Sequence, residues 1–420
     1  MKAQHVTFRD AGLRSTPLRW LNRLGAAAAR IGVGVPALHA DAICAAARRQ
    51  TGLSDFGDGG FREGLEILAE AIEREAHLST FGRIVMRGLL SGALANRLRL
   101  RDWAQRHPEV REERIERPWG ILGMPRTGTT LLSILLGLDP SSRPLLQWEA
   151  SHPVPPPDLA THAEDPRIAV VAKDLEQLQS LNPPIRAMHP MGATLATECV
   201  ALLIFDARAM SIETQAFVPS YGRWLADTDM RGAFAQHRLA LQVLQSKIPT
   251  ATWVLKTPHH LWCLDALRAE YPDIRLIWMH RDPVKVVPSV ASLVTSLQRT
   301  NADCVDPLAV GAEWNRRLHD GLMRGMAYAD RQKERDWCFH LQYAELMRDP
   351  LDAVERLYAH FGESVTALHR RRMEVWMRDR GQDAFGRHHY ALADFGLSEE
   401  EIDDRYADYC KRFDVPREGR

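Results

Sequence analysis

Hydrophobic and polar positions divide the chain into a helical first part and a mixed second part. In residues 1 to about 115, apolar residues recur at helical spacing, as at Leu65, Leu68 and Ile72, which predicts amphipathic helices. From Pro118 onward, short apolar runs alternate with segments of helical periodicity. This alternation is typical of a parallel sheet covered by helices. The predicted strands are Trp119–Met124, Thr252–Lys256, Ile274–Met279 and Cys338–Tyr343.

We therefore predict an α/β fold, a P-loop-like parallel sheet flanked by helices, preceded by a helical N-terminal region at residues 1–115. The sheet belongs to residues 116–395, within which 141–250 form an insertion that supplies lids and acceptor walls. A helical C-terminal tail is expected at residues 396–420. The N-terminal region carries no motif, so the sequence does not indicate its role.

Composition narrows the choice of partners and compartment. Lysine plus arginine equals aspartate plus glutamate at 54 each, so broad binding to nucleic acid is not expected and any anion site must be local. The six cysteines form no CxxC pair, which argues against a zinc site or a disulfide framework and favours a reducing compartment. No transmembrane or secretory segment is predicted. We expect a cytoplasmic protein, and no pattern predicts its oligomeric state.

The most informative motif directly follows the first predicted strand. Residues 123–130 read GMPRTGTT and precede an apolar helix. A strand, a glycine-containing loop and a helix form the context of a phosphate-binding loop, whose backbone N–H groups and helix dipole hold a phosphate. Thr129 stands where a nucleoside triphosphatase carries its lysine. The loop therefore suits a donor with one 5′-phosphate and a second charged group, which Arg126 is placed to contact.

The PRTGTT segment resembles the 5′-phosphosulfate loop of sulfotransferases, in the form found in tyrosylprotein sulfotransferases and many bacterial small-molecule sulfotransferases. A second motif points to the same donor, because Arg281 ends the third predicted strand and Ser289 follows eight residues later. This pair resembles the sulfotransferase motif that binds the 3′-phosphate. The resemblance covers roughly residues 116–395 and implies 3′-phosphoadenosine 5′-phosphosulfate (PAPS) as co-substrate. It implies no metal, since neither motif comes with metal ligands.

Candidates for the chemistry follow from the same resemblance. Lys256 ends the second predicted strand and opens the sequence KTPHH, which resembles the lysine-x-proline turn of tyrosylprotein sulfotransferases and implies a cation at the leaving group. The cytosolic enzymes place a histidine two residues after this lysine, but Pro258 stands there. Glu149 matches the glutamate of the tyrosylprotein enzymes when a two-residue insertion is allowed, so it is the first candidate for the base. The other candidates for the base are His259, His260 and Glu198.

Further donor contacts are implied by resemblance alone. Tyr343 resembles the tyrosine that contacts adenine, and residues 386–390 (GRHHY) resemble the C-terminal segment that closes over the nucleotide. The predicted donor-binding residues are Arg126, Thr127, Gly128, Thr129, Thr130, Arg281, Ser289, Tyr343, Arg387 and His388.

The sequence thus predicts a PAPS-dependent O-sulfotransferase acting on a small acceptor. One alternative is a P-loop kinase, which Thr129 and the lack of an evident magnesium ligand disfavour. The other is a non-catalytic module that binds PAPS or a nucleotide, which Arg126, Lys256 and Glu149 disfavour. Aromatic residues in the insertion favour a hydrophobic alcohol, phenol or lipid as acceptor. These aromatic residues are Trp148, Phe205, Phe217, Tyr221 and Trp224.

Overall fold

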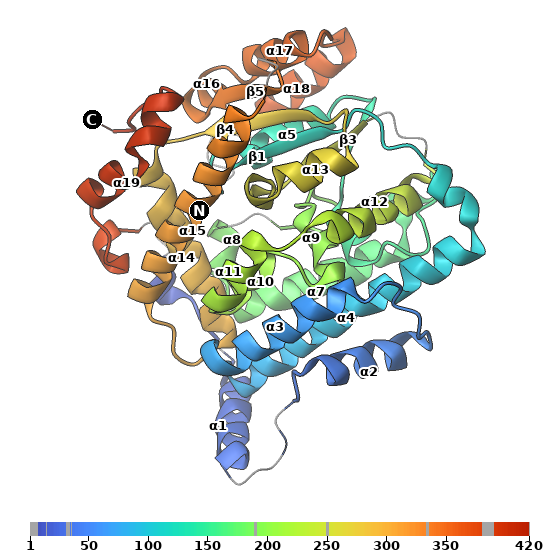
Figure 1. Cartoon of the computed structure of the whole chain (residues 1–420), viewed down its shortest axis with the longest axis vertical. Coiled ribbons are helices and arrows are strands. Elements are labelled where there is room, and N and C mark those ends of the chain that lie inside the picture. Colours follow the sequence, from blue (N-terminus) through green and yellow to red (C-terminus); the bar gives the residue numbers. More distant parts are fainter. Residues whose placement is uncertain are drawn as a thin grey trace.

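A parallel sheet lies at the centre of the computed structural model, which describes residues 7–13, 15–30, 34, 36–188, 191–248, 252–332, 336–379 and 390–419. Its five strands run in the order β2-β3-β1-β4-β5 (Figure 1). The predicted α/β fold is confirmed. The strands are β1 Trp119–Gly123, β2 Ser142–Pro144, β3 Thr252–Lys256, β4 Arg275–His280 and β5 Cys338–Gln342.

Sequence analysis missed the edge strand β2. It has three residues, all partly exposed, and one of them is a proline. Such a strand gives no apolar run, and proline is tolerated at an edge because it has no N–H to donate to the ladder.

Helices surround this sheet. The α-helices are α1 Thr16–Arg30, α2 Ala40–Thr51, α3 Gly60–Glu75, α4 Thr80–Arg106, α5 Thr129–Gly137, α6 Gln147–Ser151, α7 Pro166–Leu181, α8 Ile185–Met188, α9 Val200–Leu203, α10 Ser211–Gln215, α11 Pro219–Asp227, α12 Arg231–Gln245, α13 Leu264–Glu270, α14 Pro283–Asn301, α15 Pro307–Asp330, α16 Tyr343–Arg348, α17 Pro350–His360, α18 Ala367–Asp379 and α19 Glu399–Arg412. Short 3-10 helices are η1 Phe8–Asp10, η2 Pro108–Glu112, η3 His162–Glu164, η4 Ile204–Asp206, η5 Pro258–Trp262 and η6 Leu392–Phe395.

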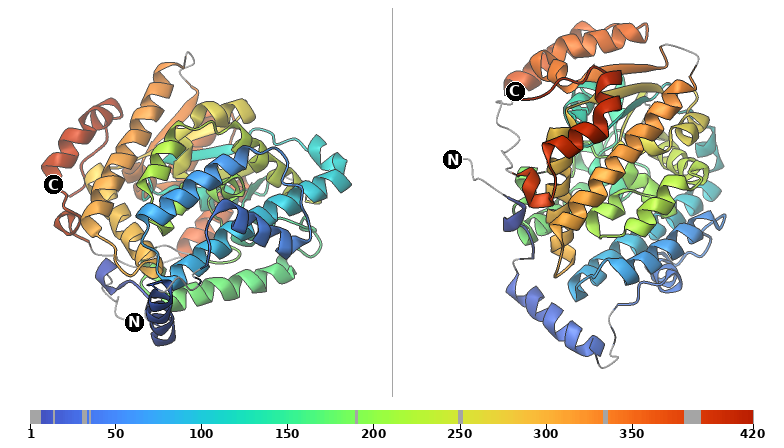
Figure 2. Two further views of the ribbon diagram at one scale, coloured as in Figure 1. Left: turned by 60° about the horizontal axis from the view of Figure 1, so that its bottom comes forward. Right: turned by 60° about the vertical axis from the view of Figure 1, so that its left-hand side comes forward.

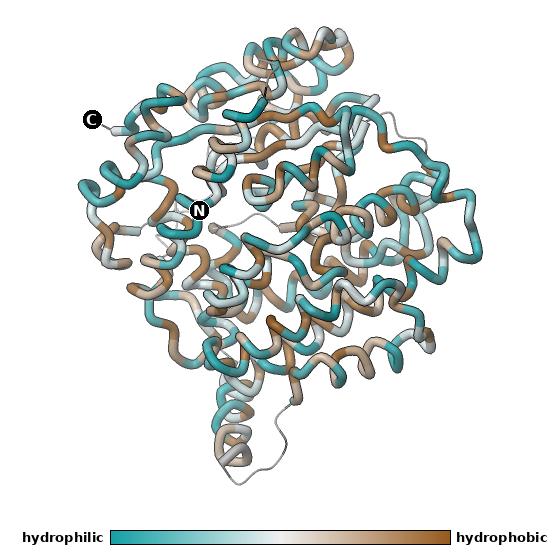
Figure 3. The backbone as a smooth tube through the Cα atoms, in the orientation of Figure 1, coloured by the Kyte–Doolittle hydropathy of each residue, from teal (hydrophilic) through white to brown (hydrophobic). Residues whose placement is uncertain are grey.

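The central strands are buried on both faces, as a doubly covered parallel sheet requires. In β3, Val254 packs toward α5 and α16–α18, whereas its neighbours Trp253 and Leu255 pack toward α12, α13 and α15. This alternation is the period of two of an extended strand. Figure 3 shows the strands as largely hydrophobic, which is why they appear in the sequence as continuous apolar runs.

The N-terminal helices share the core with the sheet. Leu65 and Leu68 of α3 and Leu94 of α4 are buried in the same hydrophobic cluster as Leu255 and Trp278. The described part of residues 1–115 is helical and contains no strand. Helix α1 stands out from the rest of the molecule (Figures 1 and 2). None of the described helices has the length and apolar character needed to cross a bilayer.

Candidate active site

A cavity of about 960 Å³ lies at the carboxyl edge of the sheet. In open α/β sheets, ligands bind at this edge. Four lining residues come directly from the ends of strands or the loops after them: Gly128 after β1, Thr257 after β3, Arg281 after β4 and Tyr343 after β5. The predicted donor-binding residues that line the cavity are Arg126, Gly128, Thr129, Thr130, Arg281 and Tyr343.

The loop between β1 and α5 turns sharply. Gly128 has a φ of 88°, and a Cβ there would lie 3.1 Å from Cδ2 of Tyr343. Arg126 also takes a left-handed conformation, with a φ of 68°, which costs a non-glycine residue about 1–2 kcal/mol. Backbone strain of this kind occurs where surrounding structure fixes a functional loop. Helix α5 begins at Thr129, so its N-terminal N–H groups lie at the cavity wall.

The two predicted phosphate motifs meet in space. Nη1 of Arg281 donates to the Arg126 carbonyl at 2.6 Å, and Nε of Arg126 donates to Oγ of Ser289 at 3.3 Å. Burial, with the nearby Arg281 charge, lowers the pKa of Arg126. The Arg281 guanidinium also lies 3.8 Å from the ring centroid of Tyr343. Residues more than 150 positions apart therefore form one cationic corner of the cavity.

One predicted contact, Thr127, has another placement, and two others lie outside the described residues. Thr127 is buried and its Oγ1 donates to the Met124 carbonyl at 2.7 Å, so its side chain closes the loop. Arg387 and His388 lie outside the described residues.

A C-terminal carboxylate, which sequence reasoning missed, binds the predicted 3′-phosphate arginine. Arg281 donates from Nε and Nη2 to the two oxygens of Glu418, at 2.7 and 3.0 Å. Burial opposes the charge on Arg281, but the hydrogen bonds and charge of Glu418 outweigh it and raise the pKa of the guanidinium. Asp282, the N-cap of α14, accepts hydrogen bonds from the backbone N–H of Glu418 at 3.0 Å and from Arg417 at 2.9 Å. No motif marks Glu418 in the sequence.

Lys256 lies between the phosphate loop and a carboxylate. Its Nζ is 3.4 Å from Oγ1 of Thr130 and 3.3 Å from Oε1 of Glu198. The Lys256 side chain is 3% exposed and that of Glu198 is 30% exposed. The backbone N–H of Cys199 donates to the Lys256 carbonyl at 3.0 Å, which holds Glu198 beside the lysine. Thr130 and Glu198 both line the cavity.

Glu149, the first candidate for the base, does not line the cavity. Its side chain is fully buried and accepts hydrogen bonds from Arg143 at 2.5 Å, from the Leu146 N–H at 3.1 Å and from His162 at 2.9 Å. Burial favours the neutral acid, but these contacts outweigh it and lower the pKa of Glu149 below its ordinary value. A buried, ion-paired carboxylate of this kind is a poor proton acceptor. The structure therefore brings Glu198, and not Glu149, next to Lys256.

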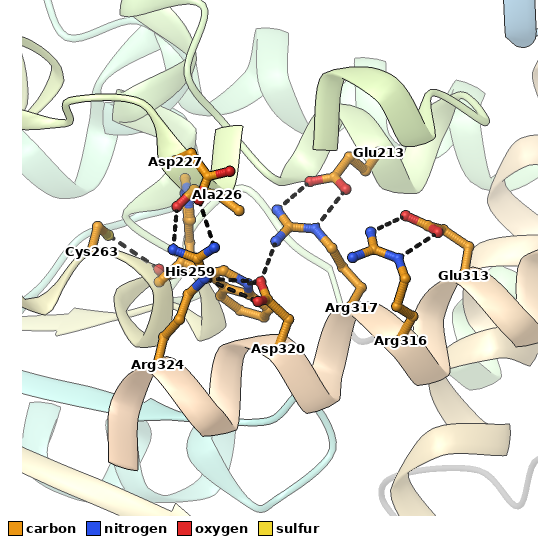
Figure 4. Close-up of polar contacts among 11 residues, drawn as sticks. Glu213, Ala226, Asp227, His259, Cys263, Glu313, Arg316, Arg317, Asp320 and Arg324 are labelled. Carbon is orange, nitrogen blue, oxygen red and sulfur yellow. Dashed lines mark hydrogen bonds and ion pairs between the residues drawn. The ribbon is translucent and has the colours of Figure 1, made fainter. Parts of the chain in front are cut away.

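His259 and His260 are also buried away from the cavity, although Thr257 and Pro258 before them line it. Burial lowers the pKa of each histidine to about 3. The charge of the buried Arg317 adds to this lowering for His259, and Figure 4 shows Arg317 donating two hydrogen bonds of 2.9 Å to Glu213. His260 faces Sγ of Cys199 at 3.4 Å. Both histidines belong to the core below the site.

The other half of the cavity is mostly apolar, and its sources differ from the prediction. Of the five aromatic residues predicted as acceptor walls, Phe205 lines the cavity and the other four do not. Helix α4 of the N-terminal region, whose role the sequence did not indicate, contributes directly to the lining. Helix α14 forms another wall. The apolar lining residues from these and neighbouring elements include Leu89, Ala93, Leu178, Ile185, Met188, Val200, Ile204, Val290, Leu293, Val294 and Leu297.

Side chains suited to a metal do not gather in the described part of the chain, where no group of three or more His, Cys, Asp or Glu residues has the required arrangement. The six cysteines are free thiols.

Known proteins are similar to this chain in fold and in sequence. The profile of the sulfotransferase family matches residues 118–367. The crystal structure of sulfotransferase STF9 from Mycobacterium avium has a TM-score of 0.83 and 35% identity, covering 91% of this chain and 98% of that one. Sulfotransferase STF1 from Mycobacterium tuberculosis H37Rv has a TM-score of 0.80 and 32% identity, covering 89% of this chain and 100% of that one.

A curated relative matches over a shorter span. Omega-hydroxy-beta-dihydromenaquinone-9 sulfotransferase Stf3 of Mycobacterium bovis is 26% identical over 164 residues, which are 37% of this chain and 41% of that enzyme. The match therefore spans about two fifths of the relative's length. The family profile covers more than half of the chain, and the two crystal structures share its fold over nearly the whole length. The chain belongs to the sulfotransferase family.

Proposed function

We propose that this sulfotransferase transfers a sulfuryl group from PAPS to a hydroxyl of a small, hydrophobic acceptor. The observation that carries the proposal is the position of Lys256, which contacts Thr130 of the phosphate loop on one side and Glu198 on the other. Lys256 itself is buried behind the cavity wall, but Thr130 and Glu198 on either side of it both line the cavity.

The donor is bound at two phosphate sites. The N–H groups of the loop and of the α5 N-terminus bind the 5′-phosphosulfate, as helix N-termini bind anions generally. Arg126 adds positive charge there. Arg281 and Ser289 bind the 3′-phosphate, and Tyr343 contacts the adenine. No metal takes part in this proposal.

The transfer needs one cation and one base. The acceptor oxygen forms a bond to sulfur while the bond from sulfur to the phosphate oxygen breaks, and 3′-phosphoadenosine 5′-phosphate (PAP) leaves. Lys256 stabilises the charge that develops on the bridging oxygen, the kind of contribution that dominates phosphoryl-type transfer. Glu198 receives the acceptor's proton, because it is the partly exposed carboxylate beside Lys256.

The apolar half of the cavity accounts for the acceptor class. Its walls are mainly aliphatic side chains, which favour an alcohol, a phenol or a lipid over a sugar polymer. The name of the relative Stf3 gives a hydroxylated menaquinone as its substrate, and this supports a lipid-like acceptor here.

The test is transfer of labelled sulfate from PAPS to a panel of hydrophobic alcohols and phenols, with products identified by mass spectrometry. We expect sulfated products and tighter binding of PAP than of AMP. Binding of PAP without transfer to any acceptor would support a nucleotide-binding module. Turnover of ATP in place of PAPS would support a kinase.

A further inference from the structure

A continuous polar wall runs along one side of the cavity. It starts beside Glu198 with Thr197, whose Oγ1 donates to Gln147 at 2.8 Å, and Gln147 in turn donates to Oγ of Ser151 at 3.2 Å. Nδ2 of Asn96 donates to the Ser151 carbonyl at 2.8 Å, and Nη1 of Arg99 donates to Oδ1 of Asn96 at 3.2 Å. Residues 96, 99, 147, 151, 197 and 198 all line the cavity. This chain of contacts therefore connects the Lys256–Glu198 pair to Arg99.

Three arginines line the cavity: Arg126 and Arg281 in the proposed donor site, and Arg99. Its position on α4 is partly buried, and burial lowers the pKa of its guanidinium. It donates one hydrogen bond, to Asn96, and it forms no ion pair with a carboxylate of the described chain. A guanidinium has five N–H donors, so most of those of Arg99 are available to a ligand.

Two other titratable groups line the same part of the cavity. Burial, with the nearby charges of Arg99 and Arg167, lowers the pKa of His152, so this imidazole is neutral near neutral pH. Asp174 on α7 is exposed at the rim and forms no ion pair with Arg99. Arg99 is therefore the cation of this wall, and a partly desolvated cation favours an anionic partner.

We propose that Arg99 binds a carboxylate of the acceptor, so that the preferred acceptor is an amphipathic hydroxy acid. This inference rests on the proposed sulfuryl transfer. The hydroxyl of the acceptor lies at Lys256 and Glu198, its carboxylate at Arg99, and its apolar body against the aliphatic side chains of α4, α7 and α14. Carboxylate is the group that a planar guanidinium binds best, through two parallel hydrogen bonds.

The experiment compares ω-hydroxyalkanoic acids with 1-alkanols of the same chain length as acceptors. We expect the wild-type enzyme to favour the acid about tenfold or more in kcat/KM at the chain length that spans the two ends. In Arg99→Gln this acid-to-alcohol ratio falls about 10–100-fold, the scale of a charge-assisted hydrogen bond. Arg99→Glu reverses the preference toward ω-hydroxyalkylamines. Arg111→Gln is the matched control, because it makes the same change at an exposed arginine that does not line the cavity, and it leaves the acid preference in place.

The outcomes separate this inference from the proposed function. Affinity for PAP shows that each variant is folded. Sulfation of alcohols and acids at equal rates, or an acid preference that persists in a folded Arg99→Gln, would overturn the role of Arg99 and leave the sulfotransferase function intact. Failure to bind PAP and to sulfate either series would overturn the proposed function itself.

Discussion

Arg281 and Glu418 form a two-point ion pair, with Nε and Nη2 of the arginine donating to both carboxylate oxygens. This is the geometry in which a guanidinium also binds a phosphate. A 3′-phosphate and Glu418 therefore compete for the same edge of Arg281. We expect Glu418→Gln to tighten PAP binding several-fold, measured by titration calorimetry. The exposed Asp408 on α19 provides the control, because Asp408→Asn makes the same change in net charge; equal effects of the two variants would rule out competition.

Removal of Arg281 tests the same site by taking away the group that binds the phosphate. We expect Arg281→Ala to weaken PAP by about 1.5–3 kcal/mol, the contribution of a hydrogen bond to a charged group. Binding of AMP, which has no 3′-phosphate, should change much less. Equal affinities of the wild type for AMP and PAP would contradict the assignment of Arg281 and Ser289 to the 3′-phosphate.

The two glutamates near the site should behave differently. We expect Glu198→Gln to lower kcat about 10²–10⁴-fold, the usual contribution of a general base, with little change in PAP affinity. The acceptor in this assay is an aliphatic alcohol, because an acidic phenol ionises readily and masks the loss of the base. A wild-type kcat for Glu198→Gln would exclude this residue as the base.

Glu149→Gln should instead affect stability. It removes the carboxylate that faces Arg143 and His162 in the core, and breaking a buried ion pair costs about 3 kcal/mol or more. We expect a lower free energy of unfolding in urea and a kcat close to that of the wild type once the variant is folded. A folded Glu149→Gln with a kcat reduced 100-fold or more would restore Glu149 as the candidate base.

The fold and the cationic corner formed by Arg126, Arg281 and Ser289 could be predicted from local sequence patterns. Buried parallel strands give apolar runs, and the segments around Arg126 and Arg281 combine strand, turn and helix in a few residues. The contact of Glu198 with Lys256 could not be predicted from the sequence, because it depends on a backbone hydrogen bond between positions 199 and 256. Glu149 is the opposite case, in which a sequence pattern indicated the site but the side chain lies elsewhere. Its distance from the loop matched a family pattern, but Arg143, six residues earlier, binds its carboxylate in the core.

Lys256 should act on the chemical step more than on binding. We expect Lys256→Met to lower kcat about 10²–10³-fold, the scale of losing one group that stabilises transition-state charge. With a donor whose leaving group is more acidic, the defect should shrink, since less charge then needs stabilisation. A constant defect across leaving groups would mean that Lys256 does not act on the bridging oxygen.

Buried histidines should make the stability of the protein depend steeply on pH. Burial lowers the pKa of His237, His259 and His260 to about 3, whereas each titrates near 6.5 when the chain unfolds. Because the folded pKa is depressed, the native state is fully favoured above pH ~6.5 and loses stability as the pH falls toward 3. Each histidine contributes about 1.4 kcal/mol per pH unit in that range, so the three together give about 4 kcal/mol per unit.

Urea unfolding at several pH values between ~6.5 and ~4.5 measures this slope, in a window above the range in which carboxylates such as Glu149 take up protons. The imidazoles of His280 and His340 also have lowered pKa values and add to the wild-type slope. His260→Asn removes one imidazole, so its slope should be smaller by about 1.4 kcal/mol per pH unit, whatever the variant loses in stability at neutral pH. His39, the N-cap of α2, is exposed, and His39→Asn serves as the control that removes an imidazole outside the core. A free energy of unfolding that stays constant across the window would mean that the three imidazoles are protonated in the native state, and their placement in the core below Lys256 would then be wrong.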